Sequence, residues 1–245
     1  MLISYSHRFI FFHVAKVAGL SIRDALQPYV QEPERFGGVR RPPRQIGGQP
    51  NGLYAMWESM LLHAKASEAE RKLPPDVFDG FYKFAFVRNP WDWQVSMYHF
   101  ILKEADHIHH GRVREMPDFA AYLEWVVRTD KPFTRGATKL QKDMVADAQG
   151  RLLVDFVGRY ENLAEDFAEV CAAIGLDARL PHINSTRRRD YQSYYNSHTR
   201  RLVEAHFRED IEFFGYRFGG HEASGMPLHR GESALAGLDC FAGAA

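Results

Sequence analysis

Two short stretches of the sequence contain residues that could bind an anion. In the first, "FIFFHVAKVAGLSIRDAL" from position 9, an apolar run ends at His13 and a turn with Lys16 follows. An amphipathic segment then begins at Gly19, Leu20 and Ser21. A strand, a tight loop and a helix N-terminus can together surround a phosphate or sulfate with backbone N–H groups. The Walker pattern is absent, and a solvated surface lysine is the competing interpretation.

The second stretch, "FAFVRNPWDWQVSMYHF", repeats the order strand, turn, helix. It places Arg88 at the end of the apolar run and Ser96 eight residues later. An arginine fork and a serine hydroxyl in this arrangement can converge on one phosphate. The competing interpretation pairs Arg88 with Asp92 to cap the turn. Three aromatic residues of the helix are expected in the core: Trp91, Trp93 and Tyr98.

The elements that must position these residues alternate along the chain. Strands are expected at 8–14, 81–87 and 151–158. Helices are expected at Ser21–Val30, 55–72, 91–104, 118–128, 162–174 and 197–214. Strands alternating with helices predict an α/β fold, with a central parallel sheet and helices on both faces. After Phe218 the sequence is rich in Gly, Ala and Ser, so we expect a domain over 1–218 and a mobile tail over 219–245.

Composition narrows the classes of function. The 245 residues include 31 Lys plus Arg and 31 Asp plus Glu, so net charge gives no reason to expect nucleic acid or anionic membranes as partners. Cys171 and Cys240 are too few for a disulfide framework, and Cys171 is expected in a helix core. No apolar run is long enough to span a membrane, and the N-terminus reads as a strand. We therefore expect a cytoplasmic protein.

These motifs resemble the sulfotransferases that use 3′-phosphoadenosine 5′-phosphosulfate (PAPS), in the branch of carbohydrate sulfotransferases and their bacterial relatives. The family signature His-x-Pro-Lys-Thr-Ala-Gly-Thr-Ser is matched by "HVAKVAGLS", with Ala15, Val17 and Leu20 as departures. The signature Arg-Asn-Pro-x-Asp, with a serine eight after the arginine, is matched intact by "RNPWDWQVS". "VDFVGRYENLAEDF" and the segment from "LPHINSTRRR" to about 218 extend the likeness. The resemblance implies a P-loop-like three-layer fold.

The resemblance also implies a role for each matched residue. Lys16 would bridge the leaving oxygen and the transferred sulfuryl group. The 5′-phosphate would be held by Ala18, Gly19, Leu20 and Ser21. Arg88 and Ser96 would hold the 3′-phosphate. A loop over its 3′ side would be formed by Ser185, Thr186, Arg187 and Arg188. PAPS would be the donor and 3′-phosphoadenosine 5′-phosphate (PAP) the product, with no metal required.

A hydroxyl acceptor benefits from a general base whose pKa lies near 7, and histidine fits this need best. Among twelve histidines we favour His63, because the family often places its catalytic histidine upstream of the arginine that Arg88 matches. A packed, structural His63 is the competing interpretation, and His13 is the reserve candidate. The polar segment "HIHHG" at 107–111 has no carboxylate or cysteine pattern nearby that is typical of a metal site, so we expect no zinc there.

The acceptor is expected to be a small molecule or glycan with a hydroxyl group, most simply a carbohydrate. The loops at 31–52 and 105–117 are the expected walls of its site. Two other functions stay open from the sequence. One is a non-catalytic relative that binds only the nucleotide or a glycan, and the other is a kinase-like phosphate-loop enzyme.

Overall fold

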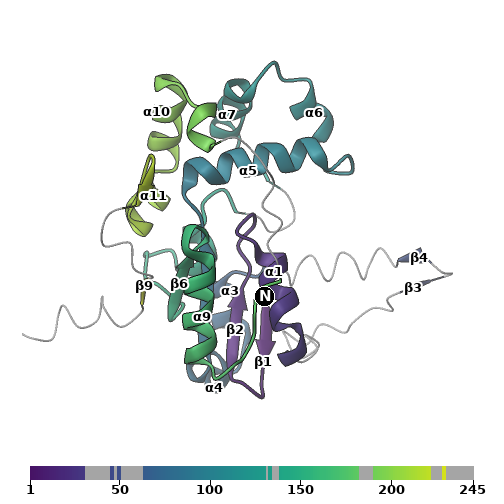
Figure 1. Ribbon diagram of the computed structural model, residues 1–245, viewed down its shortest axis with the longest axis vertical. Coiled ribbons are helices and arrows are strands. Elements are labelled where there is room, and N and C mark those ends of the chain that lie inside the picture. The colour runs from purple at the N-terminus through teal and green to yellow at the C-terminus, as the bar shows by residue number, and fades with distance from the viewer. Residues whose placement is uncertain are drawn as a thin grey trace, which may run out of the picture.

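The computed structural model describes residues 1–30, 45–46, 49–50, 63–130, 132–133, 138–181, 190–221 and 228–229 (Figure 1). Most of the predicted loop 31–52 and the first part of the predicted helix 55–72 lie outside these residues. So do four predicted site residues, Ser185, Thr186, Arg187 and Arg188. Their roles stay predictions.

A five-stranded sheet forms the centre of the fold. Its order is β1 (Leu2–Ser4), β2 (Phe9–Phe12), β5 (Tyr82–Val87), β6 (Phe156–Arg159) and β9 (Leu228–His229). The three central strands β2, β5 and β6 are parallel, as predicted. The edge strands β1 and β9 pair antiparallel to their neighbours, so the whole sheet is mixed. Neither edge strand was predicted, because a run of two or three residues is too short to show strand periodicity.

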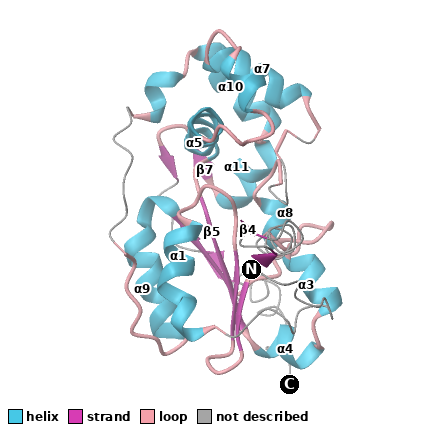
Figure 2. Cartoon of the chain, turned by 90° about the vertical axis from the view of Figure 1, so that its right-hand side faces the viewer, coloured by secondary structure: helices cyan, strands magenta, loops and turns pink. Residues whose placement is uncertain are grey.

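Helices cover both faces of this sheet (Figure 2). One face carries α1 (Gly19–Leu26) and α9 (Leu163–Ala173). The other carries α3 (Ala66–Lys72), α4 (Pro75–Gly80) and α8 (Lys142–Val145). The three-layer α/β fold predicted from the sequence is therefore confirmed.

A second group of helices lies beyond the carboxyl end of β5 (Figure 1). It consists of α5 (Pro90–Lys103), α6 (His110–Arg114), α7 (Phe119–Arg128), α10 (Ser197–His206) and α11 (Arg208–Phe214). Short 3-10 helices occur at Gln27–Tyr29, Tyr160–Asn162 and Tyr191–Tyr194. No helix among the described residues is long and apolar enough to cross a membrane.

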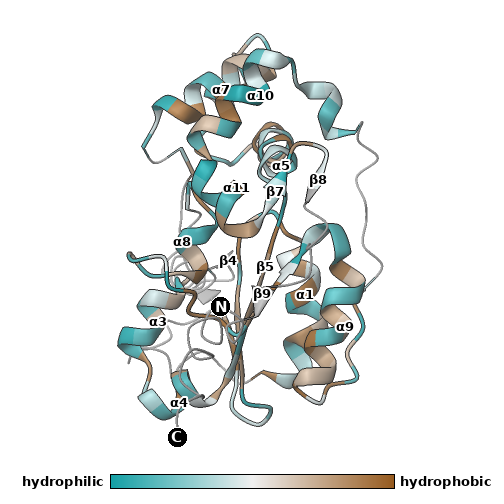
Figure 3. Cartoon of the chain, turned by 90° about the vertical axis from the view of Figure 1, so that its left-hand side faces the viewer, coloured by the Kyte–Doolittle hydropathy of each residue, from teal (hydrophilic) through white to brown (hydrophobic). Residues whose placement is uncertain are grey.

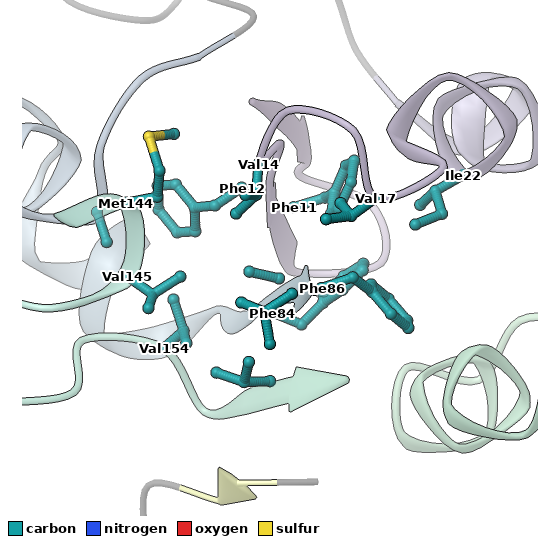
Figure 4. Packing of buried hydrophobic residues seen from close by; sticks show 14 of the residues in the cluster. Phe11, Phe12, Val14, Val17, Ile22, Phe84, Phe86, Met144, Val145 and Val154 are labelled. Atoms are coloured by element: carbon teal, nitrogen blue, oxygen red, sulfur yellow. The ribbon is translucent and has the colours of Figure 1, made fainter. Parts of the chain in front are cut away.

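The central strands are buried on both faces, which explains their nearly continuous apolar sequences. All four residues of β2 are fully buried, and β5 is mostly hydrophobic along its length (Figure 3). Side chains alternate between the two faces: Phe12 lies on the side of Met144, and Phe11 on the side of Val17 (Figure 4). Gly158 in β6 has no room for a side chain, because a Cβ atom there would lie 2.4 Å from the Phe86 ring.

Several element boundaries differ from the sequence prediction. Of the helix expected over 55–72, the described residues 63–65 are not helical, and α3 begins at Ala66. The helix expected from Ser21 starts earlier, at Gly19, and passes into a 3-10 turn that contains Pro28. The strand expected at 151–158 joins the sheet only from Phe156. The helix expected over 197–214 is divided into α10 and α11 at Phe207, whose φ of −116° is not helical and whose side chain is buried.

Two minor strand pairs complete the described chain. Strands β3 (Gln45–Ile46) and β4 (Gln49–Pro50) pair with each other, as do β7 (Tyr216–Arg217) and β8 (Gly220–His221). Strands β8 and β9 fall within the range 219–245, where β8 pairs with β7 and β9 with β6. The mobility expected for that range as a tail stays a prediction.

Candidate functional site

The candidate site lies where β2 and β5 end side by side. Because these strands are parallel neighbours, the loop after β2 and the turn after β5 emerge at the same edge of the sheet. Two hydrogen bonds join them: Arg88 Nη1 donates to the Lys16 carbonyl at 3.1 Å, and Trp93 Nε1 to the Ala15 carbonyl at 2.7 Å. The two stretches singled out in the sequence are thus in direct contact.

The loop between β2 and α1 has an unusual backbone. Lys16 and Ala18 both adopt left-handed conformations, with φ of 65° and 60°, although neither is a glycine. Left-handed residues alternating with right-handed ones turn successive N–H groups toward one side and create an anion-binding concavity. Helix α1 begins at Gly19 with no side-chain cap, so the N–H groups of its first turn have no partner within the helix. Both features favour an anion at this position.

Donors around the loop engage its carbonyl oxygens. Besides the bonds from Arg88 and Trp93, the His13 carbonyl lies 3.0 Å from His63 Nδ1. The Ala18 carbonyl accepts from the Ile22 N–H at 3.1 Å. A carbonyl oxygen facing a phosphate would repel it, so fixing these oxygens on protein donors suits the loop to negative charge.

Gly19 allows His13 to pack behind the loop. A Cβ atom on Gly19 would lie 2.0 Å from Cδ2 and Nε2 of the His13 ring, so any side chain there would displace one of them. The His13 ring stacks on Phe11 and is only 5% exposed. Burial lowers the pKa of His13 well below its usual range, and nearby His63 lowers it further. The reserve candidate for the base is therefore a buried, neutral residue of the core.

The His63 ring contacts the His13 ring, with ring centroids 4.9 Å apart. A carbonyl oxygen only accepts, so the contact with the His13 carbonyl places a proton on His63 Nδ1. In the neutral ring Nε2 is then the basic nitrogen. Burial, the largest cause, lowers the pKa of His63, which keeps the ring neutral near pH 7. Its tautomer and charge are those of a general base.

The Lys16 side chain is directed toward α5. Its ammonium lies 4.1 Å from the centre of the Phe100 ring, a cation–π contact. The Phe100 ring in turn contacts His107 edge-on, with centroids 5.7 Å apart. Lys16 is therefore ordered beside the loop, and the interpretation of a merely solvated lysine does not describe it.

Arg88 is 4% exposed, and its guanidinium contacts three partners. Its Nε and Nη2 lie 2.7 Å from Asp92 Oδ2, Nη1 donates to the Lys16 carbonyl, and the Tyr160 ring stacks at 3.8 Å. The pair with Asp92 that the sequence offered as the structural interpretation is thus present. Within the described chain these bonds use three of the five guanidinium N–H groups, which leaves one on each terminal nitrogen for a ligand.

The other predicted residues of the loop and of α5 surround these groups. Ser96 is partly buried and lies one turn beyond Asp92 on the same side of α5. Leu20 is 68% exposed in the first turn of α1, and Ser21 is partly buried beside it. Trp91 and Trp93 are buried, as expected.

The histidines at 107–110 make structural contacts. His110 Nδ1 lies 3.0 Å from the Ile101 carbonyl, and His109 packs edge-on against Trp125. Among the described residues no three His, Cys, Asp or Glu side chains are grouped so as to hold a metal ion.

Sequence reasoning missed three contributors to the site. Trp93 was expected only to pack, yet its indole N–H also holds the Ala15 carbonyl. Phe100 receives the Lys16 ammonium, and Gln141 bonds to the backbone of Arg88. An aromatic residue on a helix and a glutamine in a loop have no distinguishing pattern, so no sequence signal could have revealed them.

The fold and site together define an α/β protein whose loop after β2, at the carboxyl ends of the parallel central strands, has a backbone suited to an anion. The family model described as "Sulfotransferase family" matches residues 1–217, and the chain belongs to that family. An uncharacterized protein of Archaeoglobus fulgidus is 35% identical over 104 residues, covering 42% of this chain and 76% of that protein.

A match to a solved structure is distant. The crystal structure of mouse sulfotransferase SULT7A1 complexed with PAP has 14% sequence identity and a TM-score of 0.42, and the match covers 85% of each chain. The family model ends at residue 217, and the domain boundary expected at 218 stays a prediction.

Proposed function

We propose that this protein transfers the sulfuryl group of PAPS to a hydroxyl acceptor. Membership of the sulfotransferase family supports sulfuryl transfer in general. The observation that carries the proposal is the direct bond between the two signature motifs, from Arg88 to the carbonyl of Lys16. That bond holds the loop between β2 and α1, whose backbone N–H groups form a cradle for one phosphate, next to an arginine that can bind a second. A sulfuryl donor with phosphates at its 5′ and 3′ positions needs both sites.

Each phosphate has its own set of donors in this proposal. The 5′-phosphosulfate lies against the backbone of Ala18, Gly19, Leu20 and Ser21. At Leu20 only the N–H can serve, because this side chain has no hydroxyl. The 3′-phosphate lies against the two remaining N–H groups of Arg88 and the hydroxyl of Ser96. The loop containing Ser185, Thr186, Arg187 and Arg188 closes over it.

Lys16 acts on the transition state. In-line sulfuryl transfer resembles phosphoryl transfer: the acceptor oxygen forms a bond to sulfur while the bond to the leaving phosphate oxygen breaks. Negative charge grows on the leaving oxygen, and an ammonium beside it lowers the barrier. For this, Lys16 leaves the ring of Phe100 and turns toward the cradle, a rotation of its long side chain alone.

His63 takes the proton of the acceptor hydroxyl. Its Nδ1 is engaged by the His13 carbonyl, so Nε2 receives the proton as the new oxygen–sulfur bond forms. The acceptor we propose is a sugar hydroxyl, bounded by the segments 31–52 and 105–117, the second of which contains α6 rather than the continuous loop expected from the sequence. A hydroxyl on a small molecule other than a sugar would meet the same requirement.

The decisive experiment compares two nucleotides on wild type and on an Arg88→Ala variant. Wild type should bind PAP more tightly than adenosine 5′-phosphate. Arg88→Ala should remove most of that difference and weaken PAP binding by about 2–4 kcal/mol, because a charge-assisted contact is lost. Isothermal titration calorimetry measures both affinities.

The matched control is Arg128→Ala, since the Arg128 side chain is 77% exposed and paired only with Glu124 on its own helix among the described residues. It should bind both nucleotides as wild type does. Equal binding of the two nucleotides by wild type would refute the 3′-phosphate role. Tight PAP binding without sulfate transfer from PAPS to any of a panel of sugar alcohols would make the protein a binder instead of an enzyme.

A further inference from the structure

The backbone of Arg88 is held by the side chain of Gln141. Gln141 Oε1 accepts from the Arg88 N–H at 2.9 Å, and Gln141 Nε2 donates to the Arg88 carbonyl at 2.8 Å. Arg88 lies one residue past the end of β5, where the strand ladder stops. The amide of Gln141 therefore supplies the two hydrogen bonds that a neighbouring strand would make there.

Gln141 is in turn held by Asp210, from α11. The Gln141 N–H donates to Asp210 Oδ2, and the Lys142 N–H donates to Asp210 Oδ1, both at 2.8 Å. The carboxylate thus binds the first N–H groups of α8 and fixes the backbone from which the Gln141 side chain extends. Gln141 and Asp210 are each only 1% exposed.

Such a chain of buried polar groups is costly unless it is fully bonded, and apolar residues could fill the same space. The hydrogen bonds of Gln141 and Asp210 fix the orientation of the Arg88 backbone. Arg88 must keep its guanidinium on Asp92, on the Lys16 carbonyl and on the Tyr160 ring at the same time. A backbone rotation of a few tens of degrees at Arg88 would break these contacts, and a two-point clamp on its N–H and C=O opposes that rotation.

We propose that Gln141 is a positioning residue for Arg88 and that Asp210 holds Gln141 in place. The functional part of this inference rests on the proposed role of Arg88 at the 3′-phosphate. In that role the clamp fixes the direction of the two guanidinium N–H groups that remain for the ligand. Neither Gln141 nor Asp210 touches the nucleotide.

Two substitutions of Gln141 separate the clamp from simple packing. Gln141→Leu keeps a similar volume and removes both hydrogen bonds. Gln141→Glu keeps an acceptor for the Arg88 N–H, but it places a carboxylate oxygen against the Arg88 carbonyl. The glutamate variant should therefore lie between wild type and the leucine variant in every measurement. Gln149→Leu is the matched control, because Gln149 is exposed in a turn that follows the C-terminal end of α8, whereas Gln141 precedes its N-terminal end.

The first measurement needs no ligand. Amide hydrogen exchange should show the Arg88 N–H protected in wild type, although it lies outside β5. In Gln141→Leu this protection should fall about 10- to 100-fold, the expected effect of losing one buried hydrogen bond. The amides of Phe84 and Phe86 within β5 should keep their protection. An Arg88 amide that exchanges equally in both proteins would overturn the positioning role.

The second measurement concerns the nucleotide. Gln141→Leu should lose about 10-fold in PAP affinity and about threefold or less in affinity for adenosine 5′-phosphate, since only the 3′ contact depends on Arg88. Asp210→Asn, whose amide can accept only one of the two N–H groups, should show a smaller loss in the same direction. Equal losses for both nucleotides would mean a general structural defect and would refute the inference.

The two measurements distinguish failure of this inference from failure of the proposed function. In one case, Gln141→Leu changes the exchange of the Arg88 amide, but wild type binds PAP and adenosine 5′-phosphate equally. The positioning role of Gln141 would then stand, and the 3′-phosphate role of Arg88 would be refuted. In the other case, Gln141→Leu leaves the exchange of the Arg88 amide unchanged, and wild type still prefers PAP to adenosine 5′-phosphate. The proposed function would then stand, and the positioning role of Gln141 would be refuted. The glutamate variant provides the same test if the leucine variant does not fold.

Discussion

The loop after β2 and the turn after β5 have the same order of elements and are built in opposite ways. The first loop uses its backbone: two left-handed residues, an uncapped helix start and carbonyls bound by outside donors. The second turn uses side chains. Asn89 caps α5 through the Trp91 N–H, and its amide donates to the carbonyls of Arg217 and Gly220. The Asn89 N–H donates to Glu161.

The two regions contact each other but depend on each other unequally. Two carbonyls of the first loop are held by Trp93 and Arg88, both from the second region. The second region is held by groups elsewhere in the fold, among them Gln141 and Glu161. Substitutions in the second region should therefore disturb the first loop, whereas substitutions in the first loop should leave the second intact. In the proposed function, the chemistry itself belongs to the first loop and His63.

The largest expected effect is at His63, which contacts the first loop. His63→Asn should lower turnover about 10²–10⁴-fold with nucleotide affinity near wild type, because asparagine cannot take the proton. In wild type, kcat/KM should fall as the pH drops through an apparent pKa below the usual 6.5, since the base must be neutral and burial, the N-terminus and Arg23 all lower its pKa.

Activity and melting temperature should be measured on the same samples of His63→Asn. A variant that melts lower but turns over normally per folded molecule would show that His63 only packs. The base would then have to be sought outside the first loop, and the division of roles between the two regions would be wrong.

A smaller loss is expected at Lys16. Lys16→Ala should reduce kcat about 10²–10³-fold, as when one donor to a developing charge is removed, and should change the Kd for PAP much less. Single-turnover kinetics with PAPS separates the two constants. Unchanged turnover with weaker binding would place Lys16 in ground-state recognition, the role here given to Arg88.

The pH dependence of the free energy of unfolding should show what it costs to bury the Asp210 carboxylate, which supports the second region through Gln141. Burial raises the pKa of Asp210 to about 7 from its usual 3.8, against the two backbone hydrogen bonds that lower it. Since the folded protein holds this proton more tightly than the unfolded chain, the stabilisation is complete below about pH 4 and is lost as the pH rises through about 7. The slope should approach about 1.4 kcal/mol per pH unit for one proton. Denaturant unfolding at pH 5 to 8 measures it, and Asp210→Asn should lack this slope.

The smallest effect directly tests the direction of dependence. Trp93→Phe keeps an aromatic ring in the core and removes the N–H that holds the Ala15 carbonyl, so it should weaken nucleotide binding by about 0.5–1.5 kcal/mol. Trp125→Phe is the control, since Trp125 lies on α7 away from the loop. If Trp93→Phe binds both PAP and adenosine 5′-phosphate as wild type does, the first loop does not need its outside donors.

The sequence predicted the parts of the fold that repeat a pattern. The buried runs at Phe9–Phe12 and Tyr82–Val87 are mostly apolar because both faces of these strands are covered. The apolar runs can be recognised in the sequence. The motif residues Lys16 and Arg88 were found because their types and spacing are specific. That the two motifs meet was learned from the structure, in which β2 and β5 are adjacent parallel strands that end at one edge.

What the sequence could not show depends on contacts between distant residues. Gln141 reaches Arg88 from 53 positions away, and Asp210 reaches Gln141 from 69. Neither residue type has a spacing that marks such a role. The left-handed conformation of Lys16 was also hidden, because a lysine with positive φ is stable only when the surrounding structure enforces it.

The edge strand β9 has a consequence for how the chain is made. Its residues Leu228 and His229 cover the outer edge of β6, at Val157 and Phe156. A ribosome releases β6 long before its partner, so during synthesis the edge presents open backbone groups to any other chain. A fragment trimmed to the 217 residues that the family model matches would keep that edge open permanently. The pairing of Leu228 and His229 with β6 therefore shortens the open edge that another chain could pair with.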